Sequence, residues 1–436
     1  MSCETASQNA TPPGSAIAPG AGAVDVRAAA GAIGSGGWEW PGGGRGAIDP
    51  RVAALVPGFD APFFQAGLAG YSDGAMRIIA RRHGCPFCVT EALLDRTLLA
   101  GGRGFDKADL GELRDNVPGG AEDAPLACQI MGSEPREMAA AAVKAIEQRA
   151  RSDKAYRVMA YEADAVPAGV LRLPGGEQIR GESDDGDGEA QPDGSFAVID
   201  VNLACPVKKI ERKARGGHWL SEPRGAIELL EAVREAVPGH IPCTVKLRRS
   251  FDDTPEMVEN FHRVFDAAYG IGYAWATVHA RTVLQKYVGP SRWTFLKDLR
   301  ERYPDRVFFG SGDVWGVEDI FRMIAYAGVS GVSVARGCIG NPWIFRQARD
   351  MMAGGPPRPP TVAEQREVLR EHFRLSLACT RRYRQPEAAT SMMMRKFGIR
   401  FAQHHPRAEA VRKRFIAVAS TNDWMSVLDD EYASEA

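Results

Sequence analysis

The chain has 436 residues, of which 44% are hydrophobic and 25% charged, and its net charge is −1. This is the composition of an ordinary soluble globular protein, and no stretch approaches the roughly 18 uninterrupted apolar residues of a membrane span, so the sequence excludes an integral membrane protein. The balanced charge also excludes a uniformly basic nucleic-acid coat, while leaving room for a local basic patch.

Cysteine usage and the N-terminal residues predict a cytoplasmic protein with reduced thiols. Eight cysteines in a chain of this length are too few for a disulfide scaffold. Residues 1–5 carry neither the basic nor the apolar region of a secretory signal. Cys85 and Cys88 have the spacing of a metal-binding or redox pair, but no second pair accompanies them, so we expect no metal site.

Residues 1–50 are predicted to form a disordered tail. They contain 11 glycines and 11 alanines and almost no bulky side chains before Trp38. Such a segment buries too little apolar surface to offset the entropy lost when it becomes ordered.

Residues 51–350 alternate short apolar runs with helical patterns, which predicts an α/β fold. The expected strands are 63–66, 87–90, 126–131, 196–202, 243–247, 274–279, 307–310 and 331–335. Eight strands that alternate with helices favour a (β/α)8 TIM barrel. An open nucleotide-binding sheet is disfavoured, because the glycines at 67 and 70 lack the fingerprint spacing that follows its first strand.

A long insertion interrupts this barrel at about 151–195. It is rich in Asp, Glu and Gly between residues 181 and 189, and it far exceeds the 2–6 residues of an ordinary connection. Two interpretations remain open: the insertion is a solvent-exposed loop without a binding function, or it binds a ligand or partner.

After a proline-rich stretch at 356–360 the alternation ends, and residues 361–436 are predicted to form a separate helical domain. Within it, residues 361–416 carry 13 Lys and Arg against 5 Glu, an excess of eight positive charges. Such an excess belongs either to a solvated surface or to a surface that binds a polyanion.

Polar side chains gather at the expected carboxyl ends of the strands, where barrels of this kind build their active sites. The polar residues are Glu91, Gln129, Asn202, Cys205, Lys246, Arg248, His279, Arg281, Ser311, Asp313 and Arg336, and the glycines Gly312 and Gly337 lie among them. Seven of the eight ends carry such a group, which is hard to attribute to chance.

These residue types fit a phosphorylated flavin across the mouth of the barrel. Gly312 and Gly337 let backbone N–H groups approach a phosphate closely, and Arg336 adds a positive charge beside them. Gln129 and Asn202 can hydrogen-bond the edge of a flat heterocycle, and a lysine in an apolar strand, Lys246, can stabilise negative charge on an electron-accepting ring. Cys205 is then either a thiol acid presented to the substrate or a small packed core residue.

Four segments resemble motifs of the tRNA-dihydrouridine synthases, in the same order and with similar spacing, over about residues 60–420. Residues 202–206, Asn-Leu-Ala-Cys-Pro, resemble the family's Asn-x-Gly-Cys-Pro motif. Residues 66–73 resemble the first-strand motif, residues 278–282 with 287–290 and Trp293 resemble the sixth-strand signature, and residues 335–343 resemble the closing Gly-Arg-Gly-x-x-Gly-Asn-Pro-Trp.

The resemblance implies a barrel flavoprotein that reduces specific uridines of tRNA to 5,6-dihydrouridine, with FMN as cofactor and NADPH as reductant. Cys205 would protonate C5 of the uracil while hydride passes from the flavin to C6. Residues expected to bind FMN are Gly67, Leu68, Ala69, Gln129, Lys246, His279, Ser311, Gly312, Asp313, Ala335 and Arg336. Residues expected to contact the base or the tRNA are Asn202, Lys208, Lys209, Arg212, Arg248 and Arg281. The helical domain would bind tRNA, and no stable protein partner or membrane is expected.

Several positions depart from the family's pattern. Gly67 replaces a proline, Ala204 and Ala335 replace glycines, and Ser311 replaces an asparagine, while residues 215–220 replace a loop of small side chains. Two alternatives therefore stay open. One is an FMN barrel that reduces a free pyrimidine or another small conjugated substrate, against which the basic helical segment argues. The other is a catalytically weak tRNA-binding relative, against which Cys205, Lys246, His279 and Arg336 argue together.

Overall fold

A computed structural model describes residues 48–99, 121–147, 196–206, 215–380 and 384–433. Most of the expected N-terminal tail, the whole 151–195 insertion and the expected tRNA-contacting residues Lys208, Lys209 and Arg212 lie outside these ranges.

Eight parallel strands form a closed barrel, which confirms the predicted fold class. The strand order runs β2-β1-β9-β8-β7-β6-β5-β4, and pairing of β2 with β4 closes the ring. The strands are β1 (Phe63–Gln65), β2 (Cys88–Val89), β4 (Leu126–Met131), β5 (Val198–Leu203), β6 (Cys243–Arg248), β7 (Trp275–His279), β8 (Phe308–Ser311) and β9 (Gly331–Val334). A further short strand, β3 (Leu93–Leu94), continues alongside β4 where β2 ends.

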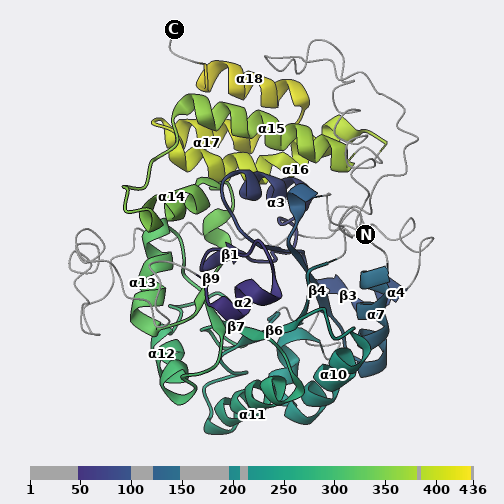
Figure 1. The fold of residues 1–436 in the computed structure, drawn as a ribbon. Helices are drawn as coiled ribbons and strands as arrows, with labels where there is room; N and C mark the ends of the chain where they lie inside the picture. Colours follow the sequence, from purple (N-terminus) through teal and green to yellow (C-terminus); the bar gives the residue numbers. More distant parts are fainter. Residues whose placement is uncertain (1–47, 100–120, 148–195, 207–214, 381–383, 434–436) are drawn as a thin grey trace, which may run out of the picture. The chain divides into compact units, whose positions relative to one another are not determined.

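Helices follow the strands and surround the barrel (Figure 1). They are α3 (Gly74–Arg82), α4 (Asp95–Leu99), α7 (Pro135–Glu147), α10 (Pro223–Ala236), α11 (Pro255–Ile271), α12 (Trp293–Arg302), α13 (Val317–Ala327) and α14 (Trp343–Met352). Short 3-10 turns are η1 (Ala121–Asp123), η2 (Gly216–Ser221) and η3 (Arg336–Cys338). The Thr254 side chain caps α11 by accepting from the Met257 N–H. Helix α7 begins at Pro135, and the Glu134 carboxylate accepts from the Glu137 N–H in its first turn.

The amino-terminal end of the barrel is filled by apolar side chains. Helix α2 (Pro50–Leu55) lies there, and its Val52 packs with Phe59, Phe64, Phe87, Trp275 and Phe309 in one buried cluster. Stacked and edge-to-face ring pairs run through this cluster, for example Phe59 on Phe87 at 4.7 Å between ring centres. The barrel is therefore closed at one end, and polar chemistry is confined to the other.

Strand alternation explains how the polar residues reach the interior. On β5, Val198 belongs to the apolar floor, Ile199, Val201 and Leu203 pack outward, and Asp200 and Asn202 face inward. Neighbouring strands keep the same register, with Gln129 beside Asp200, Asp200 beside Thr244 and Asn202 beside Lys246. Because side chains repeat every two residues, these inward positions form polar layers above the apolar floor.

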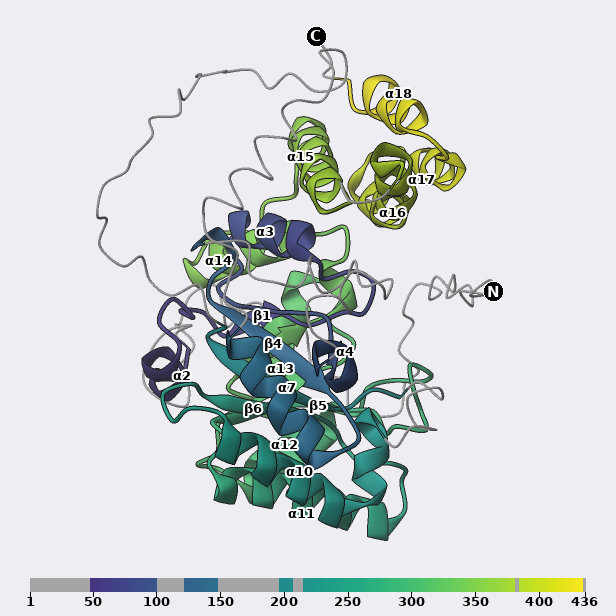
Figure 2. The same cartoon turned by 90° about the vertical axis from the view of Figure 1, so that its right-hand side faces the viewer.

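The C-terminal segment folds into the helices α15 (Val362–Thr380), α16 (Pro386–Phe401), α17 (Ala408–Ala417) and α18 (Thr421–Glu431), with the 3-10 turn η4 (Ala402–His404) (Figure 2). Helix α15 packs on α3 of the barrel. The Trp343 ring meets the Phe401 ring edge-to-face at 5.4 Å, and the Lys396 ammonium donates to the Gly70 carbonyl. The helical segment thus contacts both the first and the last strand-to-helix connection of the barrel.

Residues 417–436, which include α18, change the charge estimate for this segment. Residues 417–436 add five carboxylates, so the excess over 361–436 falls from eight to three. Three of them are already paired, since Asp429 lies 2.7 Å from Arg366, Asp430 lies 2.7 Å from Arg414, and Glu431 lies 2.5 Å from Arg407. None of the helices in the described ranges is long and apolar enough to cross a membrane.

Candidate active site

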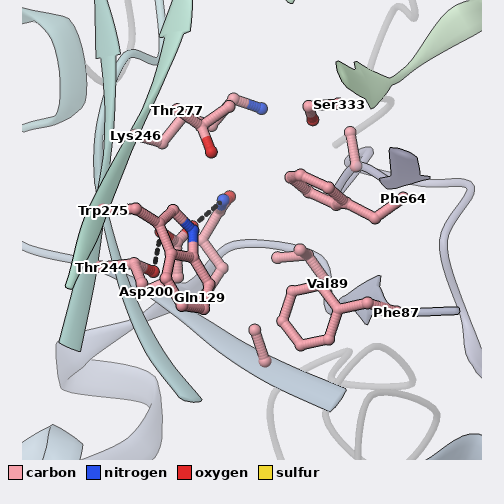
Figure 3. Close-up of a pocket in the computed structure, with 13 residues that line it drawn as sticks. Phe64, Phe87, Val89, Gln129, Asp200, Thr244, Lys246, Trp275, Thr277 and Ser333 are labelled. Carbon is pink, nitrogen blue, oxygen red and sulfur yellow. Dashed lines mark hydrogen bonds between the residues drawn. The ribbon is translucent and has the colours of Figure 1, made fainter. Parts of the chain in front are cut away.

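A cavity lies above the apolar floor of the barrel. Figure 3 shows the polar side chains Gln129, Asp200 and Thr244 on one side of it and the rings of Phe64 and Phe87 on the other. Lys246 extends from β6 into the same space. Burial lowers the pKa of Lys246, and the nearby Asp200 carboxylate opposes that shift.

A chain of side-chain hydrogen bonds crosses this cavity wall. The Asp200 carboxylate accepts from the Thr244 hydroxyl and from Gln129 Nε2, both at 2.7 Å. Gln129 Oε1 in turn accepts from Asn202 Nδ2 at 2.7 Å. Burial raises the pKa of Asp200, against which the two donors and Lys246 favour the ionised form.

The main chain on either side of Cys205 is held by three different elements. Asn202 Oδ1 accepts from the N–H groups of Ala204 and Cys205, at 2.9 and 3.1 Å. The Ala204 carbonyl accepts from Arg248 Nε at 2.9 Å, and the Cys205 carbonyl accepts from the Gly217 N–H at 3.0 Å. The thiol is half-buried, and both Lys246 and Arg248 lie close enough to interact with it electrostatically.

The loop that carries Gly216 and Gly217 packs directly on Cys205. A Cβ at Gly216 would lie 2.8 Å from the Cys205 Cβ, and one at Gly217 would lie 2.7 Å from Val283 Cγ2. Gly216 also has φ +56°, a left-handed conformation that side chains rarely adopt. The preceding Arg215 is buried and pairs with Asp95 at 3.1 Å, which fixes the start of this loop.

His279 stands among positive charges at the end of β7. Burial lowers its pKa well below the usual range, and Arg248, Lys246, Arg281 and Arg336 shift it further in the same direction. The ring is therefore neutral at neutral pH. Burial likewise lowers the pKa of Arg248 to about 10, which still leaves its guanidinium charged.

The Asp313 carboxylate, just after β8, contacts residues that follow β7 and β9. It has φ +56°, unusual for a non-glycine residue, and its carboxylate accepts from Arg281 Nη2 at 2.6 and 2.7 Å and from the Ser291 N–H at 2.7 Å. Arg336 lies 3.7 Å from the same carboxylate. The neighbouring Gly312 carbonyl accepts from Trp293 Nε1 at 2.9 Å.

Three buried polar atoms near Gly312 and Asp313 have no hydrogen-bond partner in the described part of the chain. They are His279 Nε2, Ser291 Oγ and Arg281 Nη1. A Cβ at Gly312 would lie 2.3 Å from Ser291 Oγ and 3.2 Å from His279 Cε1, so the glycine backbone adjoins these groups. Buried polar groups are nearly always satisfied, and a phosphate oxygen is an acceptor that matches a hydroxyl and a guanidinium N–H. The residues therefore fit a phosphate-bearing cofactor.

The loop after β1 lies at the same mouth. Ala69 is exposed, whereas Gly67 and Leu68 are half-buried. The Gly70 N–H donates to the Glu91 carboxylate at 2.7 Å, and the Leu68 N–H donates to Ser72 Oγ at 2.8 Å. A Cβ at Gly67 would lie 2.2 Å from the Thr90 carbonyl oxygen. The backbone after β2 therefore lies too close to Gly67 to leave room for a side chain there.

The structure brings the remaining predicted residues together at one end of the barrel. Ser311 is buried at the end of β8, and Ala335 and Arg336 follow β9 directly. Arg248 and Arg281, expected to contact RNA, here donate to the chain itself: Arg248 to the carbonyls of Ala204, Thr282 and Lys286, and Arg281 to Gly289 and Asp313.

Sequence reasoning missed four side chains of this site: Asp200, Thr244, Arg215 and Ser291. Asp200 and Thr244 lie two residues before residues that were singled out, on the same face of their strands. The alternation of strand side chains was the available signal for both. Arg215 and Ser291 lie in loops and had no such signal.

A family model described as "Dihydrouridine synthase (Dus)" matches residues 190–436, which is more than half of the chain. The chain belongs to the dihydrouridine synthase family. The match begins just before β5 and includes Cys205, the β6 to β9 ends and the C-terminal helices.

Individual relatives of this dihydrouridine synthase family member extend the match. A probable tRNA-dihydrouridine synthase of Treponema pallidum is 27% identical over 374 residues, 84% of this chain and 92% of that protein. The tRNA-dihydrouridine synthase B of Shewanella oneidensis is 26% identical over 71% of this chain and 77% of its own length. A probable tRNA-dihydrouridine synthase of Mycobacterium leprae is 34% identical over 41% of this chain, and the alignment spans 47%, about half, of that relative.

Proposed function

We propose that the protein reduces uridine in tRNA to 5,6-dihydrouridine, with FMN as cofactor and NADPH as reductant. The overall change consumes one NADPH and one proton, adds a hydride to C6 and a proton to C5 of uracil, and releases NADP⁺. The observation that carries this proposal is the placement of Cys205 on a rigidly hydrogen-bonded loop beside Lys246, at the mouth of a barrel whose family is named for this reaction.

The residues at the mouth fit FMN as the cofactor. Gly67, Leu68, Ala69, Gln129, Lys246 and His279 would hold the ring system, while Ser311, Gly312, Asp313, Ala335 and Arg336 would hold the ribityl phosphate. Bound there, FMN supplies the hydride that the uracil receives. The Ser291 hydroxyl and Arg281 Nη1, which have no hydrogen-bond partner among the described residues, add two phosphate donors to this set.

Cys205 would supply the proton to C5. Its loop is fixed through Asn202, Arg248 and Gly217, so the thiol needs little reorganisation when the base arrives. Lys246 lies close enough to Cys205 to interact with it electrostatically, and it would hold negative charge that develops during the reduction. Asn202, whose Oδ1 is committed to the Cys205 loop, would sit beside the base.

The partner in this proposal is tRNA. The C-terminal segment retains an excess of three positive charges over residues 361–436 after the five carboxylates of residues 417–436 are counted. Lys208, Lys209 and Arg212 follow Cys205 closely in sequence and would contact phosphates. Arg248 and Arg281 would act from positions already fixed by the chain, as charges that favour an anionic ligand, and not as freely rotating contacts.

Nucleoside mass spectrometry of unmodified tRNA, incubated with the purified protein and NADPH, tests the function. We expect a new dihydrouridine peak, and we expect the Cys205→Ala variant to keep bound flavin while losing most of the product. Absence of product from flavin-loaded wild-type protein, together with reduction of a free pyrimidine, would replace tRNA by a small substrate. Undiminished product from Cys205→Ala would remove Cys205 from its assigned role.

A further inference from the structure

Asp200 lies at the far end of the hydrogen-bond chain that reaches Cys205. It is 6% exposed, and hydrogen bonds through Gln129 and Asn202 connect it to the Cys205 loop. Its neighbours Gln129 and Asn202 are 2% and 7% exposed, so bulk water does not compete for their amide groups. The chain therefore connects the cavity wall to the main chain of the reactive thiol through three buried side chains.

The two ends of this chain determine the orientation of both amides between them. An ionised carboxylate only accepts hydrogen bonds, so Asp200 requires Gln129 to direct its NH2 group toward it. Gln129 must then direct Oε1 at Asn202, which must direct Nδ2 back. Asn202 Oδ1 is thereby left for the backbone N–H groups of Ala204 and Cys205, which only donate. Both ends require the same polarity, so each amide has one satisfied orientation.

We propose that Asp200 is a positioning residue for Cys205, which acts by fixing the donor and acceptor order of the Gln129–Asn202 pair. It touches neither the thiol nor, in this role, the substrate. The consequence for catalysis rests on the proposed uridine reduction, whereas the effect on the Cys205 loop does not.

Exchanging the aspartate at position 200 and the asparagine at position 202 provides a direct test. In Asn202→Asp, Gln129 lies between two carboxylates and must turn its Oε1 toward one of them, so one contact becomes repulsive. In the double variant Asp200→Asn/Asn202→Asp, Gln129 can flip as a whole. Asn at 200 then donates to Oε1, Gln129 donates to Asp at 202, and the backbone N–H groups of Ala204 and Cys205 keep their acceptor.

A second double variant separates hydrogen-bond polarity from charge. Asp200→Ala/Asn202→Asp has the same net charge as the exchange but offers Gln129 no donor at position 200. The single variant Asp200→Asn should have a small effect, because the Thr244 hydroxyl can accept from the new amide while Gln129 keeps its orientation. Asp266→Asn, on the outer face of α11, serves as the control for loss of a carboxylate elsewhere.

The readout is the rate at which iodoacetamide alkylates Cys205 in the flavin-loaded protein, resolved from the other thiols by peptide mass spectrometry. We expect Asn202→Asp to slow this reaction by about tenfold, a coupling typical of residues in one hydrogen-bond network. The exchange should return it to within about threefold of wild type, and the alanine double variant should recover less, because it removes the repulsion but leaves Gln129 Oε1 without a donor at position 200. Equal recovery in both double variants would assign the effect to charge, and no recovery in either would show that the chain does not position Cys205. Either result overturns the proposal.

Turnover completes the test. The kcat for dihydrouridine formation should follow the order of the alkylation rates, with KM for tRNA little changed, because Cys205 acts in the reaction and not in docking. Since alkylation is measured without tRNA, a protein that reduces no uridine would refute the proposed function and still test the role of Asp200. A protein that forms dihydrouridine but ignores the exchange would refute the role of Asp200 alone.

Discussion

The backbone N–H of Gly217 donates to the carbonyl oxygen of Cys205 at 3.0 Å, and the Val283 side chain packs against the position where a Cβ of residue 217 would project. A Cβ at Gly217 would lie 3.0 Å from the same oxygen and 2.7 Å from Val283 Cγ2. The loop that contains Gly217 and the loop after β7, which contains Val283, therefore pack against each other at this glycine. This contact explains why small residues occupy part of a loop that otherwise carries bulky ones such as Trp219.

We expect Gly217→Ala to lower kcat for dihydrouridine formation by about tenfold or more, because relief of the clash displaces Cys205 and positioning errors of this kind are costly to rate. Flavin content should stay at the wild-type level, since the cofactor residues lie on other loops. The control is Gly239→Ala, whose Cβ would meet nothing within 4 Å. Wild-type kcat in Gly217→Ala would show that the loop tolerates movement.

Docking of the helical segment on the barrel depends on Gly340. It has φ +65°, and a Cβ there would lie 2.6 Å from the Arg400 Cβ and 2.7 Å from the Phe401 nitrogen. We expect Gly340→Ala to lower the free energy of unfolding by about 2 kcal/mol or more, since left-handed strain adds to a backbone clash. It should also weaken tRNA binding, because α16 would be displaced.

The control Gly354→Ala separates the effect of the steric clash at Gly340 from the effect of the left-handed backbone. Gly354 has φ +82° but nothing within 4 Å of its added Cβ, so it carries the same backbone strain without the contact. Chemical denaturation and tRNA titration of both variants should show a larger loss of stability for Gly340→Ala and a loss of affinity for it alone. Equal effects would place the cost in the backbone conformation.

His372, on α15, is a buried group that disfavours protonation. It is 1% exposed, neither ring nitrogen has a hydrogen-bond partner among the described residues, and the Phe397 ring lies 4.4 Å away. Burial lowers its pKa to about 3, with a further contribution from Lys396. The unfolded chain, with a histidine pKa of about 6.5, binds the proton more readily, so stability from this group is present above pH 6.5 and falls as pH decreases.

We expect His372→Leu to stabilise the fold by about 1 kcal/mol at pH 7, because it removes two unsatisfied buried polar atoms. At pH 5 the advantage over wild type should grow by about 2 kcal/mol, since only the wild type must bury a histidine that protonates when unfolded. Denaturant unfolding at the two pH values measures both. The exposed His240→Gln variant is the control, and an advantage for His372→Leu that is independent of pH would contradict the assignment.

The sequence predicted the barrel well because its pattern is local: each strand is a short apolar run that ends in a polar residue or a glycine. Its inward positions were predicted less completely. Asn202 was identified at a strand end, yet Asp200 shares its face and holds its partner Gln129. Attention to strand ends alone missed the layer beneath them, although the two-residue repeat predicts that layer.

The sequence could not predict hydrogen-bond and ion-pair partners that lie far apart in the chain, for a different reason. Arg248 was expected to contact the base or the tRNA, but in the structure its guanidinium is held by three backbone carbonyls. Carbonyl acceptors are present in every loop, so residue identity does not indicate which of them an arginine will reach. The pairing of α18 with Arg366, Arg407 and Arg414 is similar, because charge counted over a segment does not reveal which charges neutralise one another in space.

Ser291 provides a test of the cofactor site that leaves Cys205 and its loop untouched. Its Oγ is buried without a partner among the described residues and adjoins Gly312, while its own N–H is committed to Asp313. Because a hydroxyl gains a net hydrogen bond only when the phosphate is present, Ser291→Ala should weaken FMN binding to the apoprotein by about fivefold, with stability of the apoprotein unchanged or slightly raised. Fluorescence titration with FMN measures the change.

Riboflavin, which lacks the phosphate, should bind wild type and Ser291→Ala equally, and an equal loss for both ligands would place Ser291 beside the ring system instead. Ser426→Ala, on the surface of α18, should bind both ligands as the wild type does.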